Sequence, residues 1–378
     1  MASTILVTGG AGFIGSHLVD GLLERGEAVR VLDILDPQVH PSGSLPSYIQ
    51  GHVDTGRVEL HVGDVRDRPT WRKALDGVRV VVHLAAAVGV GQSMYEVARY
   101  VEINTQGTAI LLDILANEAH RVEKLIVASS MSIYGEGSST CPECGPFVPE
   151  IREEKQLQKG DYEVHCPSCG SLANPAPTPE TKPPVPTSVY AVSKRDQEEL
   201  CLTIGRAYDI PTVALRYFNV YGPRQALTNP YAGVAAIFSS RLLNNNSPLI
   251  FEDGDQTRDF IHISDIVQAN LLAMDCSEAA GQALNIGTGR PTSVAQLAGH
   301  IAQALGSDIA PTVVGKYRSG DIRHCVADIS RAREVLGFEP RVPLANGVSD
   351  LVDWVRQQEA EDRVDIAARE LEQKGLTR

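Results

Sequence analysis

The chain has 378 residues, of which 43% are hydrophobic and 21% charged, and its formal net charge is −13 at pH 7. A chain of this length suits two lobes, and the composition is that of an ordinary globular protein. The acidic balance argues against a nucleic-acid partner, because phosphate backbones bind basic surfaces, although it allows a local basic pocket for one small phosphate ligand.

The N-terminus lacks a basic segment that leads into an apolar one, and the longest apolar run, residues 80–90, is too short to cross a bilayer. No secretion signal and no membrane partner are therefore expected, and the protein is placed in the cytoplasm. Thiols stay reduced there, and paired cysteines more often hold a metal than form disulfides.

Strand and helix patterns alternate along the first 130 residues. Residues 4–7 form a short apolar strand, apolar residues then recur at helical spacing until Gly26, and residues 28–32 form a second strand that ends at Asp33. Further strands are predicted at 58–62, 78–84 and 124–128. This alternation predicts an α/β fold with a Rossmann-type, doubly wound parallel sheet that helices cover on both faces.

Residues 136–187 interrupt this alternation. They contain four cysteines, a charged stretch and the run NPAPTPETKPPVPT, whose proline density predicts an extended connection. A helix at 191–208 and a strand at 212–216 resume the pattern. We therefore expect one domain over residues 1–215, interrupted by an insertion at 136–187, and a smaller C-terminal domain over residues 216–378, with some segments returning to the sheet.

The stretch GGAGFIG lies between the first strand and the first helix. Gly9, Gly12 and Gly15 have the spacing of the dinucleotide fingerprint, in which the glycines allow a tight turn, close approach of a pyrophosphate and close helix–strand packing. Asp33 can accept hydrogen bonds from ribose hydroxyls and would repel a 2′-phosphate, so NAD is expected rather than NADP. The alternatives are a glycine-rich turn without a ligand and, for Asp64, a turn residue instead of a contact to the adenine end.

Tyr190 and Lys194 stand four residues apart, which places a phenol and an ammonium on one face of the predicted helix. A free tyrosine has a pKa of about 10 and is a poor base at neutral pH. A nearby lysine and a positive nicotinamide ring both favour the phenolate, and lowering the pKa by ~3 requires ~4 kcal/mol of differential interaction. Ser130 follows the strand at 124–128, at the sheet edge where ligands bind.

Together these motifs resemble the extended short-chain dehydrogenase/reductase family, in its branch of NAD-dependent nucleotide-sugar epimerases and dehydratases. The resemblance runs along nearly the whole chain through GGAGFIG, GDVRD, HLAA, NTQGT, SSMSIYG, YAVSK, RYFNVYGPRQ, DGDQTRDFIHISD and YRSGDIRH. It implies that Ser130 and Tyr190 hold the sugar hydroxyl that is oxidised, that Tyr190 is the base, and that Lys194 binds the nicotinamide ribose.

The resemblance also implies two sets of ligand contacts. The NAD set, mainly in the domain at 1–215, comprises Gly9, Gly12, Phe13, Ile14, Gly15, Asp33, Asp64, Val65, Leu84, Ala85, Ala86, Asn104, Ser129, Tyr190, Lys194, Phe218 and Val220. The set for a nucleotide-diphosphate sugar comprises Ser130, Ser132, Asn219, Arg258, Arg318, Asp321 and Cys325. Asn219, Arg258, Arg318 and Asp321 are expected at the diphosphate; without the resemblance, the two arginines would be assigned to the surface.

The expected reaction is 4-epimerisation. The family's 4,6-dehydratases carry an acidic pair where this chain has Met131 and Ser132, and a methionine supplies neither acid nor base. Epimerisation needs only Tyr190 as acid and base, while NAD takes hydride from C4 and returns it to the other face of the rotated ketone. A dehydratase or reductase, or an NAD-binding scaffold without turnover, are the alternatives, although a scaffold needs no activated phenol.

The stretches AAAVGVGQSMY, ASSMSIYGEG and NPYAGVAAIF resemble the dTDP-L-rhamnose 4-epimerase group, which implies a dTDP-6-deoxyhexose (dTDP-L-rhamnose or dTDP-6-deoxy-L-talose) as substrate. The alternative is a UDP-hexose of the glucose/galactose, N-acetyl or uronic type. Many UDP-galactose epimerases carry a lysine near Val88, and this chain does not. In relatives the position of Cys325 can limit the size of the sugar, and a cysteine there leaves room for several sugars. The resemblance further implies a homodimer through helices near 95–116 and 189–207.

Cys141-x2-Cys144 and Cys166-x2-Cys169 are separated by residues 145–165, close to the spacing of a two-knuckle zinc site. Four thiolates would form a closed, structural zinc site with no open position. Two local disulfides or four free thiols are the alternatives. Because the insertion leaves the chain just after residue 135 and returns just before Tyr190, we expect a zinc-ribbon-like lid or partner surface that takes no part in the chemistry.

Overall fold

The computed structural model describes residues 4–40, 43–227, 229, 231, 233–318, 320–358, 362 and 364–378. Residues 230 and 232 of the NPYAGVAAIF stretch and residue 319 of YRSGDIRH lie outside the described residues. Within the described part of the chain, no helix is both long and apolar enough to span a bilayer.

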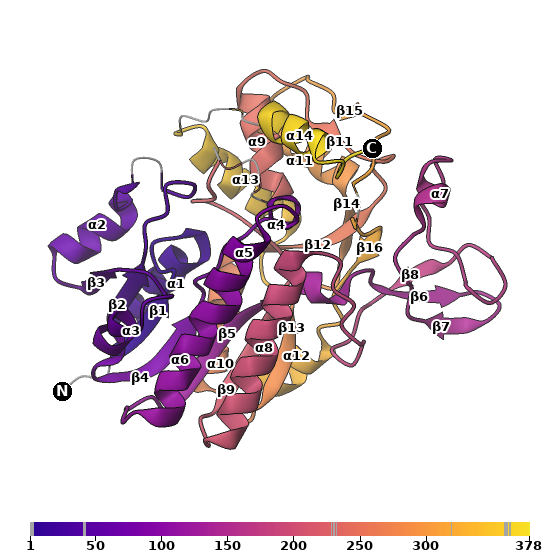
Figure 1. The fold of residues 1–378 in the computed structure, drawn as a ribbon. Coiled ribbons are helices and arrows are strands. Elements are labelled where there is room, and N and C mark those ends of the chain that lie inside the picture. Colours follow the sequence, from indigo (N-terminus) through magenta and orange to yellow (C-terminus); the bar gives the residue numbers. More distant parts are fainter. Residues whose placement is uncertain are drawn as a thin grey trace.

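A parallel sheet of seven strands forms the centre of the larger lobe (Figure 1). Its order is β13-β9-β5-β4-β1-β2-β3, and all neighbouring strands are parallel. The strands are β1 (Thr4–Thr8), β2 (Ala28–Asp33), β3 (Val58–Val62), β4 (Val78–His83), β5 (Lys124–Ser130), β9 (Thr212–Tyr217) and β13 (Gln282–Ile286). The expected α/β fold with a doubly wound parallel sheet is confirmed.

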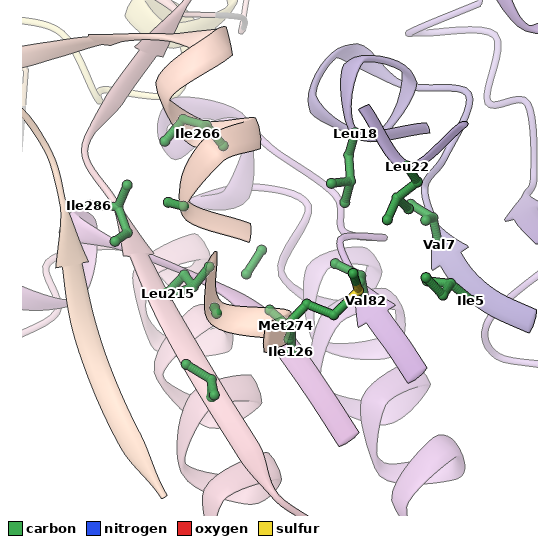
Figure 2. Close-up of a cluster of buried hydrophobic side chains, with 14 of the residues drawn as sticks. Ile5, Val7, Leu18, Leu22, Val82, Ile126, Leu215, Ile266, Met274 and Ile286 are labelled. Carbon is green, nitrogen blue, oxygen red and sulfur yellow. The ribbon is translucent and has the colours of Figure 1, made fainter. Parts of the chain in front are cut away.

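Alternating side chains along the strands send apolar groups to both faces of this sheet. Ile5 and Val7 of β1 face a core that includes Leu18 and Leu22 of α1 and Ile266 of α10 (Figure 2). The helices on this face are α1 (Phe13–Glu24), α2 (Ser47–Asp54), α10 (Ile263–Asp275) and α12 (Ser330–Leu336).

The opposite face carries a second core, to which Leu6 of β1 contributes together with α3 (Arg68–Leu75), α6 (Gly107–Asn117) and α8 (Val189–Ala207). Two short helices, α4 (Val90–Ser93) and α5 (Val97–Tyr100), and a π-helical segment, η2 (Val101–Gln106), lead into α6. In Figure 1, α6 and α8 lie side by side, and they are in contact. A 3₁₀ turn, η3 (Met131–Tyr134), follows β5.

The smaller lobe has its own core around short strands and helices of the C-terminal part. The strands are β10 (Asn219–Tyr221), β12 (Thr257–His262), β14 (Pro291–Ser293) and β16 (His324–Cys325), with β11 (Leu249–Ile250) paired to β15 (Thr312–Val313). The helices are α9 (Val234–Leu243), α11 (Val294–Leu305), α13 (Leu344–Val355) and α14 (Val364–Gln373). Strand β9 runs through residue 215, where the domain boundary was expected, and β13 and α10 return to the large lobe.

The insertion projects from the body of the molecule as a three-stranded antiparallel sheet (Figure 1). Its order is β7 (Gly145–Phe147), β6 (Ser138–Cys141), β8 (Asn174–Ala176), and α7 (Glu154–Leu157) lies between β7 and β8 in the chain. Strand β8 falls inside the proline-rich run that was expected to be a loop. Proline is tolerated there because β8 is an edge strand, where a missing N–H costs no ladder bond.

Candidate active site

A cavity of about 690 Å³ lies at the carboxyl ends of the central strands, where the strand order reverses between β1 and β4. The predicted catalytic residues Ser130, Tyr190 and Lys194 line it, as does the predicted substrate residue Asn219. So do the predicted cofactor residues Gly9, Gly12, Phe13, Ile14, Gly15, Asp33, Asp64, Val65, Leu84, Ala85, Ala86, Ser129, Phe218 and Val220. The fold thus gathers residues from distant parts of the sequence around one space.

The glycine loop connects β1 to α1 along this cavity. Gly9 has φ +68°, and a Cβ on Gly15 would lie 2.1 Å from the carbonyl oxygen of Gly9, so neither position accepts a side chain. Gly12 precedes α1 and has no side chain to cap the helix. The first N–H groups of α1 therefore face the cavity without a side-chain partner, which is the usual arrangement for binding an anion.

Asp33 is held in the cavity wall by two backbone groups. Its Oδ2 accepts a hydrogen bond from the N–H of Ala11 at 3.0 Å, and its Oδ1 accepts one from Leu35 at 2.9 Å. The side chain is 9% exposed. These two bonds fix the orientation of the carboxylate and leave lone pairs for a hydroxyl donor.

Asp64 is engaged by a residue that the sequence did not single out. Arg66, which also lines the cavity, donates from Nη2 to Asp64 Oδ2 at 2.6 Å and from Nε to both carboxylate oxygens at 3.0 Å. Burial acts to raise the pKa of Asp64, but the hydrogen bonds from Arg66 outweigh it and hold that pKa below its usual value. The only sequence signal for Arg66 was its place in the GDVRD motif.

Tyr190 lies in the first turn of α8, where three contacts fix it. Ser188 caps the helix by accepting from the N–H of Ala191 at 3.1 Å, and Ser93 Oγ accepts from the N–H of Tyr190 at 3.0 Å. The Tyr100 ring meets the Tyr190 ring edge-on at 6.5 Å. Burial raises the pKa of Tyr190, and the Ser130 hydroxyl offsets part of this rise.

Lys194 lies one helical turn after Tyr190, deeper in the structure. Burial lowers its pKa to about 8, although Cys201 and Glu198 act in the opposite direction. Its Nζ donates to Gln197 Oε1 at 2.6 Å. At neutral pH the ammonium is therefore mostly charged and is held by the amide of Gln197.

A buried polar chain continues from Gln197 to β1. Gln197 Nε2 donates to Thr108 Oγ1 at 2.8 Å, Thr108 Oγ1 lies 2.9 Å from His83 Nε2, and His83 Nδ1 lies 2.8 Å from Thr8 Oγ1. Burial, with a smaller effect from Lys194, lowers the pKa of His83 to about 3, so the imidazole stays neutral. Sequence reasoning missed Gln197 and gave His83 no role.

Asn104, expected among the cofactor contacts, lies behind the cavity wall. Its Oδ1 accepts from the N–H of Ala87 at 2.7 Å, and its Nδ2 donates to Ala87 O at 3.1 Å and Ser193 Oγ at 2.9 Å. Asn104 is fully buried in the π-helical segment η2. Because protein groups occupy its amide on both sides, it joins the loop after β4 to α8 instead of facing the cavity.

Ser132, Arg258, Arg318, Asp321 and Cys325 are not among the described residues that line the cavity. Ser132 stands next to it, because its Oγ donates to Ser130 Oγ at 2.9 Å. Arg258 and Asp321 form an ion pair at 3.2 Å. The N–H of Asp321 donates to Arg318 O at 3.2 Å, and the Arg318 guanidinium lies 4.0 Å from the centroid of the Phe251 ring.

Arg258 lies on strand β12, which pairs with β10, the strand that carries the cavity residue Asn219. The parallel register of β10 and β12 pairs Asn219 with Phe260, and Arg258 stands two residues before Phe260. Arg258 and Asn219 therefore project from the same face of this sheet. The Oδ1 atom of Asn219 is buried and has no hydrogen-bond partner among the described residues, which leaves an acceptor for a ligand.

A family model matches most of the chain. The model of the NAD dependent epimerase/dehydratase family matches residues 5–154 and 158–287. The chain belongs to the NAD dependent epimerase/dehydratase family. The expected relationship to NAD-dependent nucleotide-sugar epimerases is thereby confirmed.

Several members of this family resemble the chain along almost its full length. dTDP-L-rhamnose 4-epimerase of Burkholderia thailandensis is 35% identical over 94% of this chain and 95% of its own. UDP-glucose 4-epimerase from Thermotoga maritima, solved with UDP-glucose, is 34% identical with a TM-score of 0.74 over 94% of this chain and 99% of that chain. UDP-glucuronic acid 4-epimerase from Bacillus cereus, solved with UDP-glucuronic acid and NAD, is 29% identical with a TM-score of 0.77 over the same shares.

Cys325, expected to leave room for several sugars at a position that limits sugar size in relatives, is 1% exposed. Its Sγ lies 3.9 Å from the hydroxyl of Thr178, a residue of the insertion. Burial raises its pKa to about 12. Cys325 shares a small core with Met131 and the cavity residue Phe218, so it supports the wall of the cavity from behind.

The four cysteines of the insertion converge on one point. Their sulfur atoms all lie within 4.8 Å of one another, and the Sγ atoms of Cys141 and Cys169 are 3.5 Å apart. A tetrahedral zinc with Zn–S bonds of about 2.3 Å separates its sulfur ligands by about 3.8 Å. Because Cys141 of the first knuckle lies this close to Cys169 of the second, and all four sulfur atoms are near one another, the arrangement fits one four-thiolate site better than two local disulfides.

Proposed function

We propose that this protein is an NAD-dependent nucleotide-sugar 4-epimerase that interconverts dTDP-L-rhamnose and dTDP-6-deoxy-L-talose. One observation carries the proposal: a single cavity joins the glycine loop and Asp33 to Ser130, Tyr190 and Lys194. The 35% identity to dTDP-L-rhamnose 4-epimerase supports the choice of sugar.

The residues around the cavity fit NAD. The first N–H groups of α1 suit the pyrophosphate, and Gly12 leaves room for its approach. Asp33, fixed by two backbone bonds, suits the ribose hydroxyls and opposes a 2′-phosphate. When bound, NAD supplies the hydride acceptor for C4 of the sugar and afterwards the hydride donor.

Ser130 and Tyr190 bind the C4 hydroxyl of the sugar. Tyr190 takes the hydroxyl proton while the C4–H bond breaks and a C4 ketone forms. The flat ketone would then rotate and present its other face for reduction. Tyr190 gives the proton back to the C4 oxygen in the second half of the reaction. One residue therefore serves both steps, and no other acid or base is needed.

The phenol of Tyr190 is a poor base in the protein alone, and a positive charge that enters the cavity makes it a better one. In the protein alone, burial raises the pKa of Tyr190, while Lys194 is held by Gln197. A cationic nicotinamide ring beside Tyr190 would favour the phenolate. Proton removal is thereby tied to the presence of an oxidised cofactor.

Dehydration is disfavoured by the residue next to Ser130. Met131 is buried at 8% exposure and offers neither an acid nor a base for the loss of water. A UDP-hexose 4-epimerase is the second candidate, favoured by the 34% identity to an enzyme solved with UDP-glucose. The two candidates share all chemistry at C4 and differ in the nucleotide base and the sugar.

We propose further that Cys141, Cys144, Cys166 and Cys169 bind one structural zinc ion per chain. Structural zinc contributes ~10–16 kcal/mol in small peptides, enough to order a short insertion. Four thiolates leave no open coordination position for a substrate oxygen. The zinc therefore holds the insertion in shape, and the reaction takes place without it.

The purified protein should be incubated with dTDP-L-rhamnose, UDP-glucose, UDP-N-acetylglucosamine and UDP-glucuronate, and the released isomers separated. We expect the C4 epimer of the dTDP sugar to form without net NADH. Turnover of UDP sugars alone would favour the second candidate. Stoichiometric NADH would indicate a dehydrogenase, and no isomer from any sugar would overturn both proposals.

A further inference from the structure

A cluster of charged side chains lies between the insertion and the smaller lobe, outside the cavity. Its centre consists of Arg152 from the insertion and Glu252 and Arg323 from the smaller lobe, whose side chains are 3%, 3% and 0% exposed. Arg152 donates to Glu252 at 2.9 Å, and Arg323 donates to Glu252 at 3.1 Å. A buried charge without a partner is strongly unfavourable, so these groups hold one another in place.

Three charged residues of the insertion bind the segment 321–324. Glu136 accepts from the N–H groups of Arg323 at 2.6 Å and His324 at 3.2 Å. Arg152 donates to Asp321 O at 3.0 Å. Glu163 pairs with the guanidinium of Arg323, accepting from its Nε at 3.0 Å.

The other side of this segment holds Arg258, one of the residues expected at the diphosphate. Arg258 donates to Arg323 O at 2.9 Å, to Ile322 O at 2.6 Å and to Asp321 Oδ1 at 3.2 Å. The segment 321–324 is therefore held by the insertion on one side and by Arg258 on the other. Any shift of the segment moves the guanidinium that it fixes.

The cysteine site and this cluster are close along the chain. Glu163 stands three residues before Cys166, at the start of the hairpin that carries the second knuckle. That hairpin is closed by a bridge between His165 and Leu172 and by a bond from the N–H of Ala173 to Val164 O at 2.9 Å. A metal that fixes the knuckle also fixes the position of Glu163.

We propose that Glu163, Arg152 and Arg323 are positioning residues that couple the metal-bound insertion to the nucleoside diphosphate site. The inference rests on the proposed function, because it assigns Arg258 and Asp321 to the diphosphate of the sugar donor. With metal bound, Glu163 holds Arg323, and the segment 321–324 holds Arg258 ready for the diphosphate. Without metal, this support loosens, while the NAD half of the cavity, built by the first lobe, is unaffected.

Two carboxylates of one loop provide a matched pair of variants. Glu163→Gln removes the charge that faces Arg323 and keeps the shape of a side chain that is 36% exposed. Asp161→Asn removes a charge that faces the exposed His165 at 2.9 Å and keeps the oxygen that accepts from the N–H of Glu163. Only the first variant should disturb the segment 321–324.

Calorimetric titration with dTDP, UDP and NAD tests the coupling on the full protein. Zinc loss by chelation and Glu163→Gln should each weaken binding of the nucleoside diphosphates roughly tenfold or more, and the two together no more than either alone. The affinity for NAD and the kcat at saturating sugar nucleotide should stay within about twofold, so KM alone rises. Asp161→Asn should change none of these values.

An unchanged affinity of Glu163→Gln for dTDP and UDP would overturn the coupling, as would an equal loss of NAD binding or strictly additive effects. Failure of the proposed function would give results that differ from those of a failed coupling. If diphosphate binding depends on Glu163 and zinc but no sugar is epimerised, the coupling stands and the assigned reaction falls. If the wild type epimerises normally and Glu163→Gln matches it in KM, the reaction stands and the coupling falls.

Discussion

At the scale of single residues, Tyr190 is the group on which the proposed chemistry depends. Tyr190→Phe keeps the ring that meets Tyr100 edge-on and removes only the hydroxyl. We expect the fold and NAD binding to persist while kcat falls by roughly 10²–10⁴-fold, the usual contribution of a general base. Steady-state kinetics and thermal melting of both proteins check this, and a variant with near-normal kcat would remove Tyr190 from the mechanism.

Lys194 gives a prediction about stability and pH. Burial lowers its pKa from 10.5 to about 8, so between these values the unfolded chain binds a proton that the folded protein has lost. Stability then rises with pH through this window, because the unfolded state holds more protons there. Below pH 8 both states are protonated, and the cost of the buried charge is fully present.

Lys194→Met removes this titration and serves as the reference. The unfolding free energy of the wild type relative to the variant should rise by on the order of 3 kcal/mol from neutral pH to pH about 10.5. Denaturant unfolding of both proteins across this range measures the difference. A relative stability that stays flat with pH would show that the lysine is not buried as a cation.

Residues in one continuous strand–turn–helix unit could be predicted from the sequence. Gly9 and Asp33 followed from local spacing, and the cavity includes both. Arg66 and Gln197 could not be found in this way, because their roles depend on partners that the fold brings together. Asn104 shows the limit most clearly: its motif was recognised, but the direction of its amide depends on the π-helical segment around it.

At the scale of elements, the insertion was visible in the sequence as a break in the strand–helix alternation. The way in which the insertion attaches to the core was not visible in the sequence. Thr178, inside the proline-rich run, is fully buried and pairs with Ala327 as a parallel bridge. Lys182 is 3% exposed and donates to Tyr134 O at 2.8 Å. These contacts join residues far apart in the sequence, so composition alone predicted a loop where the structure has a second attachment to the core.

The cysteine site gives the prediction at this scale. Replacing Cys141 and Cys144 with serine should remove one zinc per chain, because two thiolates cannot hold a four-thiolate ion. KM should rise while kcat at saturating sugar nucleotide stays within about twofold, and NAD should still bind to the separate glycine loop. Elemental analysis, kinetics and NAD titration measure the three effects.

Cys276→Ser is the matched control, since Cys276 lies outside the cluster and its Sγ contacts Val335 O at 3.2 Å. It should retain zinc and wild-type kinetics. Two results would contradict the prediction. A wild type purified without oxygen that contains no metal would rule out the site, and loss of NAD binding together with zinc would make the insertion part of the core fold.

At the scale of the whole molecule, the two lobes share the central sheet. Strand β13 and helix α10 come from the C-terminal part and pack on the large lobe, so the division at residue 215 is not a line along which the chain separates. The cavity lies where the lobes meet, with Asp33 on one side and Asn219 on the other. Residues of both lobes therefore line one cavity.

The last prediction is that two copies of this chain associate through the helices η2–α6 and α8. These helices are in contact and lie side by side on one face of the molecule (Figure 1). Val101 and Val192 on them are 41% and 43% exposed, and a second copy would cover such apolar groups.

Light scattering at micromolar concentration should give twice the chain mass of 40.7 kDa. Val101→Glu combined with Val192→Glu should give a monomer that still binds NAD, since neither residue lines the cavity. Val313→Glu, on strand β15 of the smaller lobe and 54% exposed, should remain dimeric. A wild type of monomer mass, or a double variant that stays dimeric, would show that these helices do not form the interface.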